Sequence, residues 1–268
     1  MPLAVCATPI GNLRDVTLRV LDELAEADLV LCEDTRRTRI LLERHGLSAR
    51  LVSYHEHNEA ARTAEVLPQL EAGARVALVS DAGLPAVSDP GARLIAAALE
   101  RTLPVTVLPG ASSVETALVA SGFAAERYQF LGYLPRGEAA LAGVWEELRR
   151  WPWPAVAFES PRRLPRTLAS LAAALPERPA AVCRELTKQF EEVVRGSPSE
   201  LARRFGEPPK GEITLVLGLS GSPPAEDDPQ ALTAVDELVT AGVPRRQAAD
   251  LVSRLTGTSR NALYRRSL

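Results

Sequence analysis

The sequence predicts an α/β fold whose first half contains a parallel sheet, and two observations carry this prediction. Short apolar runs alternate with stretches whose apolar residues recur at helical spacing, and Gly, Pro, Asp or Asn follows most of the apolar runs. Strands that alternate with helices in this way form parallel sheets with helices on both faces. The strands expected in the first half are residues 3–7, 28–33, 51–54, 76–79 and 104–109.

The helices between these runs have recognisable start and stop signals. Asp15 is placed to cap a helix whose Thr17, Val20 and Leu24 fall on one face. Gly46 follows the helix after the second strand and is the kind of residue that ends a helix. Ser112 or Ser113 is expected to cap a helix of small residues after the fifth strand, which leaves backbone N–H groups available to a ligand.

A second α/β region and a tail of different character complete the chain. Residues 220–229 are rich in Pro, Ser and acid, a composition typical of a linker. We therefore expect an N-terminal α/β domain over 1–110, a second α/β domain over 111–219, a linker over 220–229 and a helical domain over 230–268. The strands expected in the second domain are 129–133, 154–159, 180–185, 191–196 and 212–218.

Composition excludes several classes of protein. The chain has 268 residues, a formal net charge of −3 and only three cysteines, which lie far apart in apolar runs and fit a reducing cytoplasm. No apolar run is long enough to span a membrane, so a cytoplasmic protein is expected. No phosphate-binding P-loop, no G-x-G-x-x-G after the first strand and no G-x-S-x-G elbow occurs. His55-Glu56-His57 lacks two further metal ligands, so we expect a polar loop there and no metal.

The stretch 76–91 is the clearest candidate for a binding loop. An apolar strand runs into Ser80 and Asp81 and then into a turn that holds Gly83, Asp89 and Gly91. Ligands of parallel α/β sheets bind beyond the carboxyl ends of the strands, which is where this loop lies. An ordinary βα turn uses the same residue types and is the alternative. The stronger signal is that several acids follow strands, namely Glu33, Asp34, Asp81, Asp89 and Glu159.

The tail carries a local positive charge that the whole chain does not have. Residues 243–268 contain six arginines against the single acid Asp250, a local net charge of +5. Tyr264 lies within this stretch and offers a ring on which a base can stack. The stretch is the one expected nucleic-acid surface, and a solvated helical face is the alternative.

The loops taken together resemble one family. The sequence contains, in this order, ATPIGNLRDVT, CEDTRRTRILL, SYHEHNE, VSDAGLPAVSDPG, LPGASSVETALVASG, FLGYLPR, FESPRRL, CRELTKQFEE and KGEITLVL. These motifs resemble the tetrapyrrole methylase superfamily and, within it, the ribosomal RNA small subunit methyltransferase I branch. The resemblance covers essentially the whole chain, including the basic tail.

The resemblance implies a fold and a function. Members of the superfamily have a parallel-sheet N-terminal domain and a mixed-sheet second domain, with the cofactor in the cleft between them, and they are usually homodimers. Members of this branch use S-adenosylmethionine to methylate the ribose 2′-hydroxyl of a cytidine in the decoding region of 16S ribosomal RNA. We therefore expect S-adenosylmethionine as cofactor, 16S rRNA within the small ribosomal subunit as partner, and neither a membrane nor a metal.

The resemblance also implies site residues. The expected cofactor-binding residues are Ile10, Asp81, Gly83, Leu84, Ser112, Ser113, Val114, Phe158, Leu186 and Thr214. The candidates for a catalytic base are Glu33, Asp34, Glu159 and Glu185, which the sequence does not rank. The expected RNA-binding residues are Arg36, Arg37, Arg162, Lys188, Arg245, Arg246, Arg260, Tyr264, Arg265 and Arg266.

Two positions depart from the pattern of the family. Leu84 stands where the loop usually has threonine, so an apolar contact replaces a hydroxyl. Arg162 stands where a histidine is usual, which weakens a histidine base at that position.

Three other interpretations stay open at the level of sequence. The first is a tetrapyrrole C-methyltransferase acting on a precorrin or uroporphyrinogen with the same fold. The second is a helix-turn-helix nucleic-acid-binding protein with a non-catalytic cofactor domain. The third is a non-catalytic ribosome-assembly factor.

Overall fold

The structure is a computed structural model that describes residues 2–220, 229–256 and 258–268. Its contacts divide the chain into two compact units, Met1–Ala120 with Cys183–Glu192, and Ser121–Val182 with Val193–Leu268. The segment Cys183–Glu192 thus belongs with the N-terminal residues although it follows much of the second unit in sequence. The domain boundaries at 110 and 219 stay predictions.

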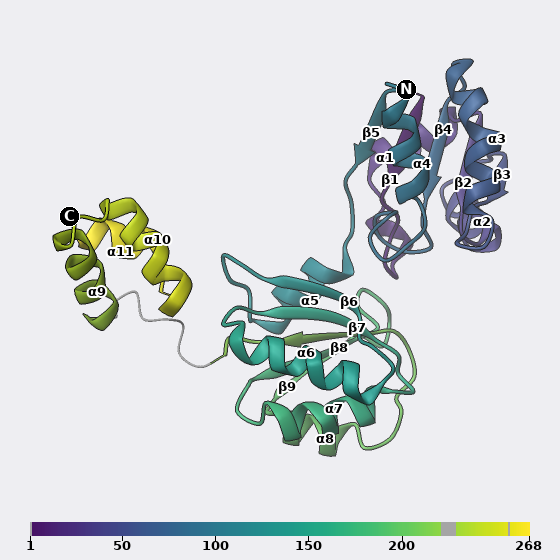
Figure 1. The fold of residues 1–268 in the computed structure, drawn as a ribbon. Helices are drawn as coiled ribbons and strands as arrows, with labels where there is room; N and C mark the ends of the chain where they lie inside the picture. The colour runs from purple at the N-terminus through teal and green to yellow at the C-terminus, as the bar shows by residue number, and fades with distance from the viewer. Residues whose placement is uncertain (1, 221–228, 257) are drawn as a thin grey trace. The chain divides into compact units, whose positions relative to one another are not determined.

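The first sheet has five strands in the order β3-β2-β4-β1-β5, and each strand pairs with its neighbours in parallel (Figure 1). Their bounds are β1 Leu3–Cys6, β2 Leu29–Cys32, β3 Leu51–Ser53, β4 Val76–Val79 and β5 Val105–Leu108. The helices that follow them are α1 Leu18–Glu26, α2 Thr35–Arg44, α3 Glu59–Glu71, α4 Ala92–Glu100 and α5 Ser113–Ser121. The parallel α/β architecture expected for the first half is confirmed.

Both faces of this sheet are buried, which explains why its strands are continuous apolar runs. On one face, Leu3 and Leu78 pack with side chains of α3 and α4. On the other face, Ala4 and Val79 pack with side chains of α1 and α2. Because successive side chains of a strand point to opposite faces, one short run supplies both cores.

One predicted cap is wrong. Asp15 ends a short 3-10 helix, Leu13–Asp15, and does not cap α1. Thr17 is the N-cap, and its hydroxyl accepts a hydrogen bond from the backbone N–H of Val20 at 3.3 Å. The spacing allowed either residue, but Asp15 belongs to the preceding 3-10 helix, so the N-cap of α1 is Thr17, two residues further on.

The second sheet is mixed, in the order β6-β7-β10-β8-β9, as the family resemblance implied. Strand β7 pairs in parallel with β6 and antiparallel with β10. The strand bounds are β6 Gln129–Tyr133, β7 Ala155–Glu159, β8 Ala180–Arg184, β9 Glu192–Gly196 and β10 Ile213–Leu217. The helices are α6 Glu138–Arg150, α7 Leu164–Ala174 and α8 Pro198–Arg204 (Figure 1).

Helix α6 was absent from the sequence prediction, although it supplies the buried Trp145 to the main core of this sheet. A buried arginine ties its end to the strands. The Arg178 guanidinium donates to the carbonyls of Leu148, Trp151, Trp153 and Gly218, and burial lowers its pKa to about 10. The four carbonyls explain why a cation is stable at this position.

The tail consists of α9 Pro229–Thr240, α10 Arg245–Thr256 and α11 Arg260–Arg266. Its helices enclose a small core of their own that includes Val235, Ala248, Val252 and Leu263. The predicted linker, 220–229, lies almost entirely outside the described residues, of which only Ser220 and Pro229 belong to it.

Candidate functional site

The loops after β1 and β4 are joined to each other beyond the carboxyl ends of the strands. The backbone N–H of Thr8 donates to the carbonyl of Gly83 at 2.8 Å, and the N–H of Gly83 donates to the carbonyl of Thr8 at 3.0 Å. The Thr8 hydroxyl also donates to the carbonyl of Ser80 at 3.1 Å. Gly83 has a φ of +79°, which a residue with a side chain adopts only with strain. The predicted binding loop is therefore fixed by hydrogen bonds to the loop after β1.

Ile10 and the loop after β5 meet Gly83 at the same place. A Cβ on Gly83 would lie 3.8 Å from Ile10 Cγ2 and 3.7 Å from the Ala111 carbonyl oxygen. Ile10 and Val114 are both 6% exposed. Two of the predicted cofactor residues, Ile10 and Gly83, thus meet the loop after β5 at Ala111.

Asp81 links the end of β4 to the start of α2. Its Oδ1 accepts a hydrogen bond from the backbone N–H of Asp34 at 3.0 Å, and its Oδ2 lies 3.4 Å from Arg37 Nη1. Burial raises the pKa of Asp81 above its ordinary value, and the Asp34 N–H and Arg37 oppose that shift. A carboxylate has about four acceptor positions, so these two partners leave room for a ligand.

Asp34 is the N-cap of α2 and is tightly paired. Its Oδ1 accepts from the backbone N–H of Arg36 at 2.8 Å, and the Arg36 guanidinium donates to both carboxylate oxygens at 3.0 and 2.7 Å. These bonds lower the pKa of Asp34 to about 2. At neutral pH the carboxylate is a weak base.

Glu33 and Asp89 have pKa values that are raised, in contrast to the lowered pKa of Asp34. Burial raises the pKa of Glu33, and the charge of Asp81 raises it further, while Arg37 and His55 lower it. Burial raises the pKa of Asp89 to about 6, and the charges of Glu33 and Asp81 add to the effect. Three carboxyl groups that disfavour one another's ionisation therefore share this edge of the sheet.

The sequence placed Asp89 with Asp81 among the acids of the candidate binding loop, but Asp89 was not named as a cofactor-binding residue or as a candidate base. The residues before it adopt left-handed backbone, with φ of +69° at Ala86 and +62° at Ser88. Conformations of this kind are costly and cluster at functional sites. The spacing of Asp81 and Asp89 within one glycine-rich loop was the available signal.

The loop after β5, which leads into α5, packs closely against the end of β1. A Cβ on Gly110 would lie 2.9 Å from the Ala7 Cβ, so only glycine lets the two segments approach this closely. Ser113 is the first residue of α5, and Ser112 lies just before it. The Ser112 hydroxyl is bonded to the Glu115 carboxylate and is thus already engaged.

The segment 185–191 contacts the loop after β1. The backbone N–H of Asn12 donates to the Thr187 hydroxyl at 3.0 Å. A Cβ on Gly11 would lie 2.8 Å from the Leu186 carbonyl and 2.6 Å from Lys188 Cγ, so the contact depends on glycine. Leu186 is 7% exposed, and Glu185 is paired with Lys188 at 2.8 Å. Leu186 and Ile10 thus belong to neighbouring loops of one unit.

Two predicted cofactor residues and one candidate base lie in the second unit. Phe158 on β7 is paired in register with Thr214 on β10, and its ring packs edge-on against Phe130 and Tyr133. Glu159 has a fully buried carboxylate that binds the Arg163 guanidinium at 2.5 Å and the Thr167 hydroxyl at 2.5 Å. This bonding gives Glu159 a structural role.

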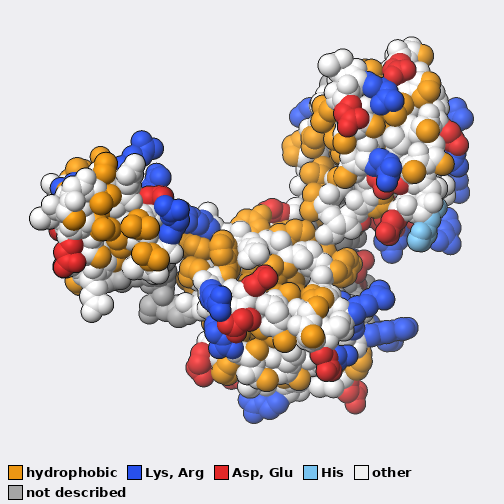
Figure 2. Space-filling view, in the orientation of Figure 1, with side chains coloured by type: hydrophobic (Ala, Val, Ile, Leu, Met, Phe, Trp, Pro, Cys, Tyr) orange, Lys and Arg blue, Asp and Glu red, His pale blue; other side chains and the backbone are white. Residues whose placement is uncertain are grey.

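The predicted RNA-binding residues differ in their partners. Arg36 and Arg37 are paired with Asp34 and Asp81, whereas Arg162 is exposed and has no ion pair with any described residue. In the tail, Arg245 lies 3.7 Å from Asp236. Figure 2 shows arginine side chains of the tail beside a hydrophobic patch. The exposed apolar side chains of the tail include Leu251 and Leu255.

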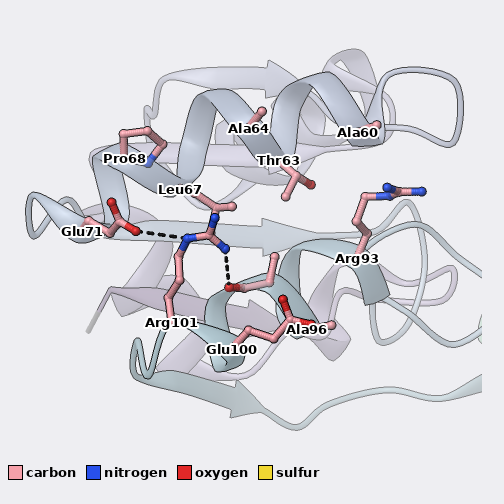
Figure 3. A pocket seen from close by; sticks show the side chains of 11 residues that line it. Ala60, Thr63, Ala64, Leu67, Pro68, Glu71, Arg93, Ala96, Glu100 and Arg101 are labelled. Atoms are coloured by element: carbon pink, nitrogen blue, oxygen red, sulfur yellow. Dashed lines mark hydrogen bonds and ion pairs between the residues drawn. The ribbon is translucent and has the colours of Figure 1, made fainter.

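A separate hollow of about 530 Å³ lies between α3 and α4 (Figure 3). Small side chains such as Ala60, Ala64 and Ala96 line it, and an ion pair of 3.1 Å between Glu71 and Arg101 crosses one end. It contains none of the predicted cofactor or catalytic residues. We therefore place the candidate site at the loops.

Comparison with known proteins defines the class. Residues 2–202 match the family model described as Tetrapyrrole (Corrin/Porphyrin) Methylases, and residues 225–268 match the model described as RsmI C-terminal HTH domain. The chain therefore belongs to the tetrapyrrole methylase family, and within it to the ribosomal RNA small subunit methyltransferase I branch.

The relatives that place the chain in this branch match it from end to end. A protein named Ribosomal RNA small subunit methyltransferase I from Micromonospora olivasterospora is 44% identical over 98% of this chain and 85% of its own length. Proteins of the same name from Mesorhizobium japonicum and Halalkalibacterium halodurans are 43% and 38% identical, over 91% and 93% of their lengths. The family expectation from the motifs is confirmed.

Solved structures share the fold at low sequence identity. Diphthine synthase superimposes with a TM-score of 0.64 at 17% identity, over 81% of this chain and 89% of that chain. A uroporphyrin-III C-methyltransferase from Thermus thermophilus, solved with S-adenosyl homocysteine, gives 0.57 at 20% identity, over 81% and 96%. At these identities the likeness concerns the fold.

Among the described residues, no helix is both long and apolar enough to cross a bilayer. No group of three or more His, Cys, Asp or Glu side chains is arranged to hold a metal ion in that part of the chain.

Proposed function

We propose that this chain is an S-adenosylmethionine-dependent methyltransferase that methylates the ribose 2′-hydroxyl of a cytidine in the decoding region of 16S ribosomal RNA. The observation that carries the proposal is the full-length match to relatives named Ribosomal RNA small subunit methyltransferase I, at up to 44% identity. The match includes the tail, which a methylase of small tetrapyrroles has no evident need for.

The loops at the carboxyl edge of the first sheet fit such a cofactor. Ile10, Leu84 and Val114 offer apolar contacts to an adenine ring or a thioether chain. The free acceptor positions of Asp81 suit a ribose hydroxyl or an ammonium group. Gly83 lets a ligand approach the backbone at the point where three loops meet. Leu186, Ser112, Ser113, Phe158 and Thr214 complete the proposed set.

S-adenosylmethionine, when bound, supplies an electrophilic methyl group on a positively charged sulfur. The protein's first task is to hold the ribose oxygen in line with that methyl group, since alignment alone provides much of the rate. A ribose hydroxyl is a weak nucleophile, and a carboxylate that accepts its proton helps.

Among the four candidate bases, the environment favours Glu33. Its pKa is raised by burial and by Asp81, which brings it nearer the operating pH of a general base. Asp34, with a pKa of about 2, is a weaker base, and the buried Glu159 is occupied by Arg163 and Thr167. Glu185 is paired with Lys188. We therefore rank Glu33 first and Glu185 second.

The partners follow from the substrate. We infer that Arg246 and Arg260 of the tail and the exposed Arg162 contact rRNA phosphates, as does Lys188 near the cofactor loops. We also infer that the enzyme acts on the small ribosomal subunit, as a homodimer, in the cytoplasm. Arg36 and Arg37, which are paired with acids here, would exchange those partners for phosphate on binding.

The test is to incubate the protein with methyl-labelled S-adenosylmethionine and small subunits from a strain that lacks the modification, and then to map the label. Label on a cytidine ribose of the decoding region is expected. Label on no RNA, with cofactor nonetheless bound, would overturn the proposal in favour of an assembly factor. Transfer to a precorrin or uroporphyrinogen would favour the tetrapyrrole alternative.

Four variants test the ranking of bases: Glu33→Gln, Asp34→Asn, Glu159→Gln and Glu185→Gln. Glu33→Gln is expected to lower the methyl-transfer rate by about 10²–10⁴-fold, the usual contribution of a general base, with little change in cofactor affinity. Asp34→Asn retains an N-cap and serves as the neighbouring control. If all four variants transfer methyl groups at nearly the wild-type rate, positioning without a side-chain base accounts for the reaction.

A further inference from the structure

Two neighbouring cavities in the tail share the same pair of arginines. One, of about 560 Å³, lies along α10 and is lined by residues that include Arg246, Asp250 and Arg260. The other, of about 250 Å³, is lined by Arg246, Arg260, Asn261 and Tyr264. Ligand pockets range from about 300 to 1,000 Å³, so together the two hollows are of a size for one nucleotide. Arg246 and Arg260 line both, and hence border the space where the hollows adjoin.

The arginines that line these cavities differ in whether an acid is paired with them. Arg254 on the rim of the larger cavity is paired with Asp250 at 2.8 Å. Arg246 and Arg260 are exposed, and neither forms an ion pair with any residue of the described ranges. Two guanidinium groups that form no ion pair with a described residue border one space, and the one acid there, Asp250, is already paired with Arg254. Guanidinium groups bind phosphate oxygens in bidentate fashion.

The smaller cavity adds groups that recognise a base. The Tyr264 side chain is 39% exposed, which leaves ring surface open to stacking, and Asn261 is exposed beside it. Aromatic rings stack on bases of single strands, whose faces are free, whereas the bases of a duplex already stack on one another. The Asn261 amide can both donate to and accept from a base edge.

We propose that the surface between α10 and α11 binds one nucleotide of single-stranded RNA, with its phosphate between Arg246 and Arg260 and its base on Tyr264. The proposal rests on the proposed function and assigns the tail's RNA contact to a single pocket. It differs from a helix that reads a duplex groove, which needs neither an accessible ring nor a hollow between the helices. It also separates these two arginines from Arg265 and Arg266, which line neither cavity.

The test measures binding of the full-length protein to a fluorescently labelled, unstructured 12-nucleotide RNA by fluorescence anisotropy at several salt concentrations. The variant R246A/R260A removes the proposed phosphate site. Its matched control, R265A/R266A, removes the same charge from the same tail but leaves both cavities intact. Loss of the pocket is expected to weaken binding by about tenfold or more and the control by less than about threefold. The salt slope should fall by about 0.7, the value for one phosphate contact of a single strand.

The stacking contact has its own pair of variants. Tyr264→Leu is expected to weaken binding by about five- to 150-fold, and Tyr264→Phe, which keeps the ring, should bind nearly as wild type. Thermal melting followed by circular dichroism shows whether each variant folds. If Tyr264→Leu does not fold, the RNA affinity of Tyr264→Phe still tests whether the ring is sufficient for binding.

Four results would overturn the proposal. Equal losses in the two double-arginine variants would mean a diffuse positive charge without a pocket. A loss in Tyr264→Phe as large as that in Tyr264→Leu would exclude stacking. Tighter binding of a 12-base-pair duplex RNA, with the same dependence on Arg246 and Arg260, would favour groove reading. Methyl transfer to small subunits is measured in parallel. A wild-type enzyme that methylates rRNA while R246A/R260A binds normally refutes the pocket alone, whereas a wild-type protein that transfers no methyl group refutes the proposed function.

Discussion

The carboxyl group of Asp89 illustrates how neighbouring residues set the chemistry of one side chain. Burial and the charges of Glu33 and Asp81 raise its pKa to about 6, far above the value near 3.9 of an unfolded chain. The folded protein therefore holds more protons than the unfolded chain between about pH 4 and pH 6. Stability due to this group is complete below about pH 4 and is lost as the pH rises through 6.

Asp89→Asn should consequently be more stable than wild type at pH 7.5 and equally stable near pH 4, because the amide never ionises. The free energy of unfolding, measured with urea at a series of pH values, checks this. Asp22→Asn, at an exposed position on α1, is the control and should follow the wild-type curve. A variant curve parallel to wild type between pH 4 and 6 would contradict the assigned environment.

Gly11 is the residue on which the contact between two cofactor loops depends. Gly11→Ala places a methyl group 2.8 Å from the Leu186 carbonyl oxygen, which is backbone and cannot move aside alone. We expect a loss of about 1–3 kcal/mol in stability, as for other overpacked sites, and weaker binding of S-adenosylmethionine.

Calorimetric titration and thermal unfolding measure both effects of Gly11→Ala. Gly206→Ala, whose new methyl group would meet only ordinary contacts of 3.7 Å or more, is the control. Cofactor affinity unchanged in Gly11→Ala would remove the segment 185–191 from the proposed site.

At the scale of the element, the helices show how far composition determines local structure. The 3.6-residue pattern indicated the helix after the first strand, but α6 was missed because Gly143 and the alanines of α6 weaken the apolar signal. The N-cap of α1 was predicted wrongly because Thr17 and Asp15 are both residue types that cap helices well. Only the 3-10 helix Leu13–Asp15, of which Asp15 is the last residue, decides which one is used.

Two glycines with open space around them test the backbone argument. A Cβ would meet nothing within 4 Å at Gly143 or at Gly46, but only Gly46, with a φ of +68°, is left-handed. Gly143→Ala should stabilise the protein by about 0.5–1 kcal/mol because alanine loses less entropy in a helix. Gly46→Ala should destabilise it by about 1–2 kcal/mol, the cost of left-handed backbone for a residue with a Cβ. Shifts of the same sign in urea unfolding would contradict this explanation.

At the scale of the molecule, the tail and the rest of the chain have separate cores. The tail core includes Val235 and Val252, and the core of the second sheet includes Trp145 and Leu168, with no residue in common. A chain ended at Ser220 should therefore bind S-adenosylmethionine within about twofold of the full chain, since the proposed cofactor residues all precede it. Its affinity for single-stranded RNA should fall by about tenfold or more as the tail's charge is lost.

Calorimetry with the cofactor and anisotropy with RNA test the shortened chain. Weak cofactor binding by a shortened chain that still melts cooperatively would show that the tail contributes to the cofactor site. Undiminished RNA affinity would place the RNA contact on the α/β body instead.

The sequence by itself determined where the strands lie along the chain, that the first half is a parallel α/β domain, and the family. Those features depend on local patterns that can be recognised in the sequence alone. The patterns are apolar runs of strand length, the turn residues after them, and the loop motifs of the family. The sequence also located Asp81 and the basic tail, because the type of each residue is enough to identify a charged side chain or a glycine-rich loop.

Only the tertiary structure decided which of these residues differ in chemistry. Glu33 and Asp34 are adjacent in sequence, yet burial beside Asp81 raises the pKa of one and Arg36 lowers the pKa of the other. Arg254 and Arg260 are alike in the sequence and line the same cavity, yet Arg254 is paired with Asp250 while Arg260 forms no ion pair with any described residue. Burial and pairing are properties of residues brought together by folding, and spacing along the chain does not contain them.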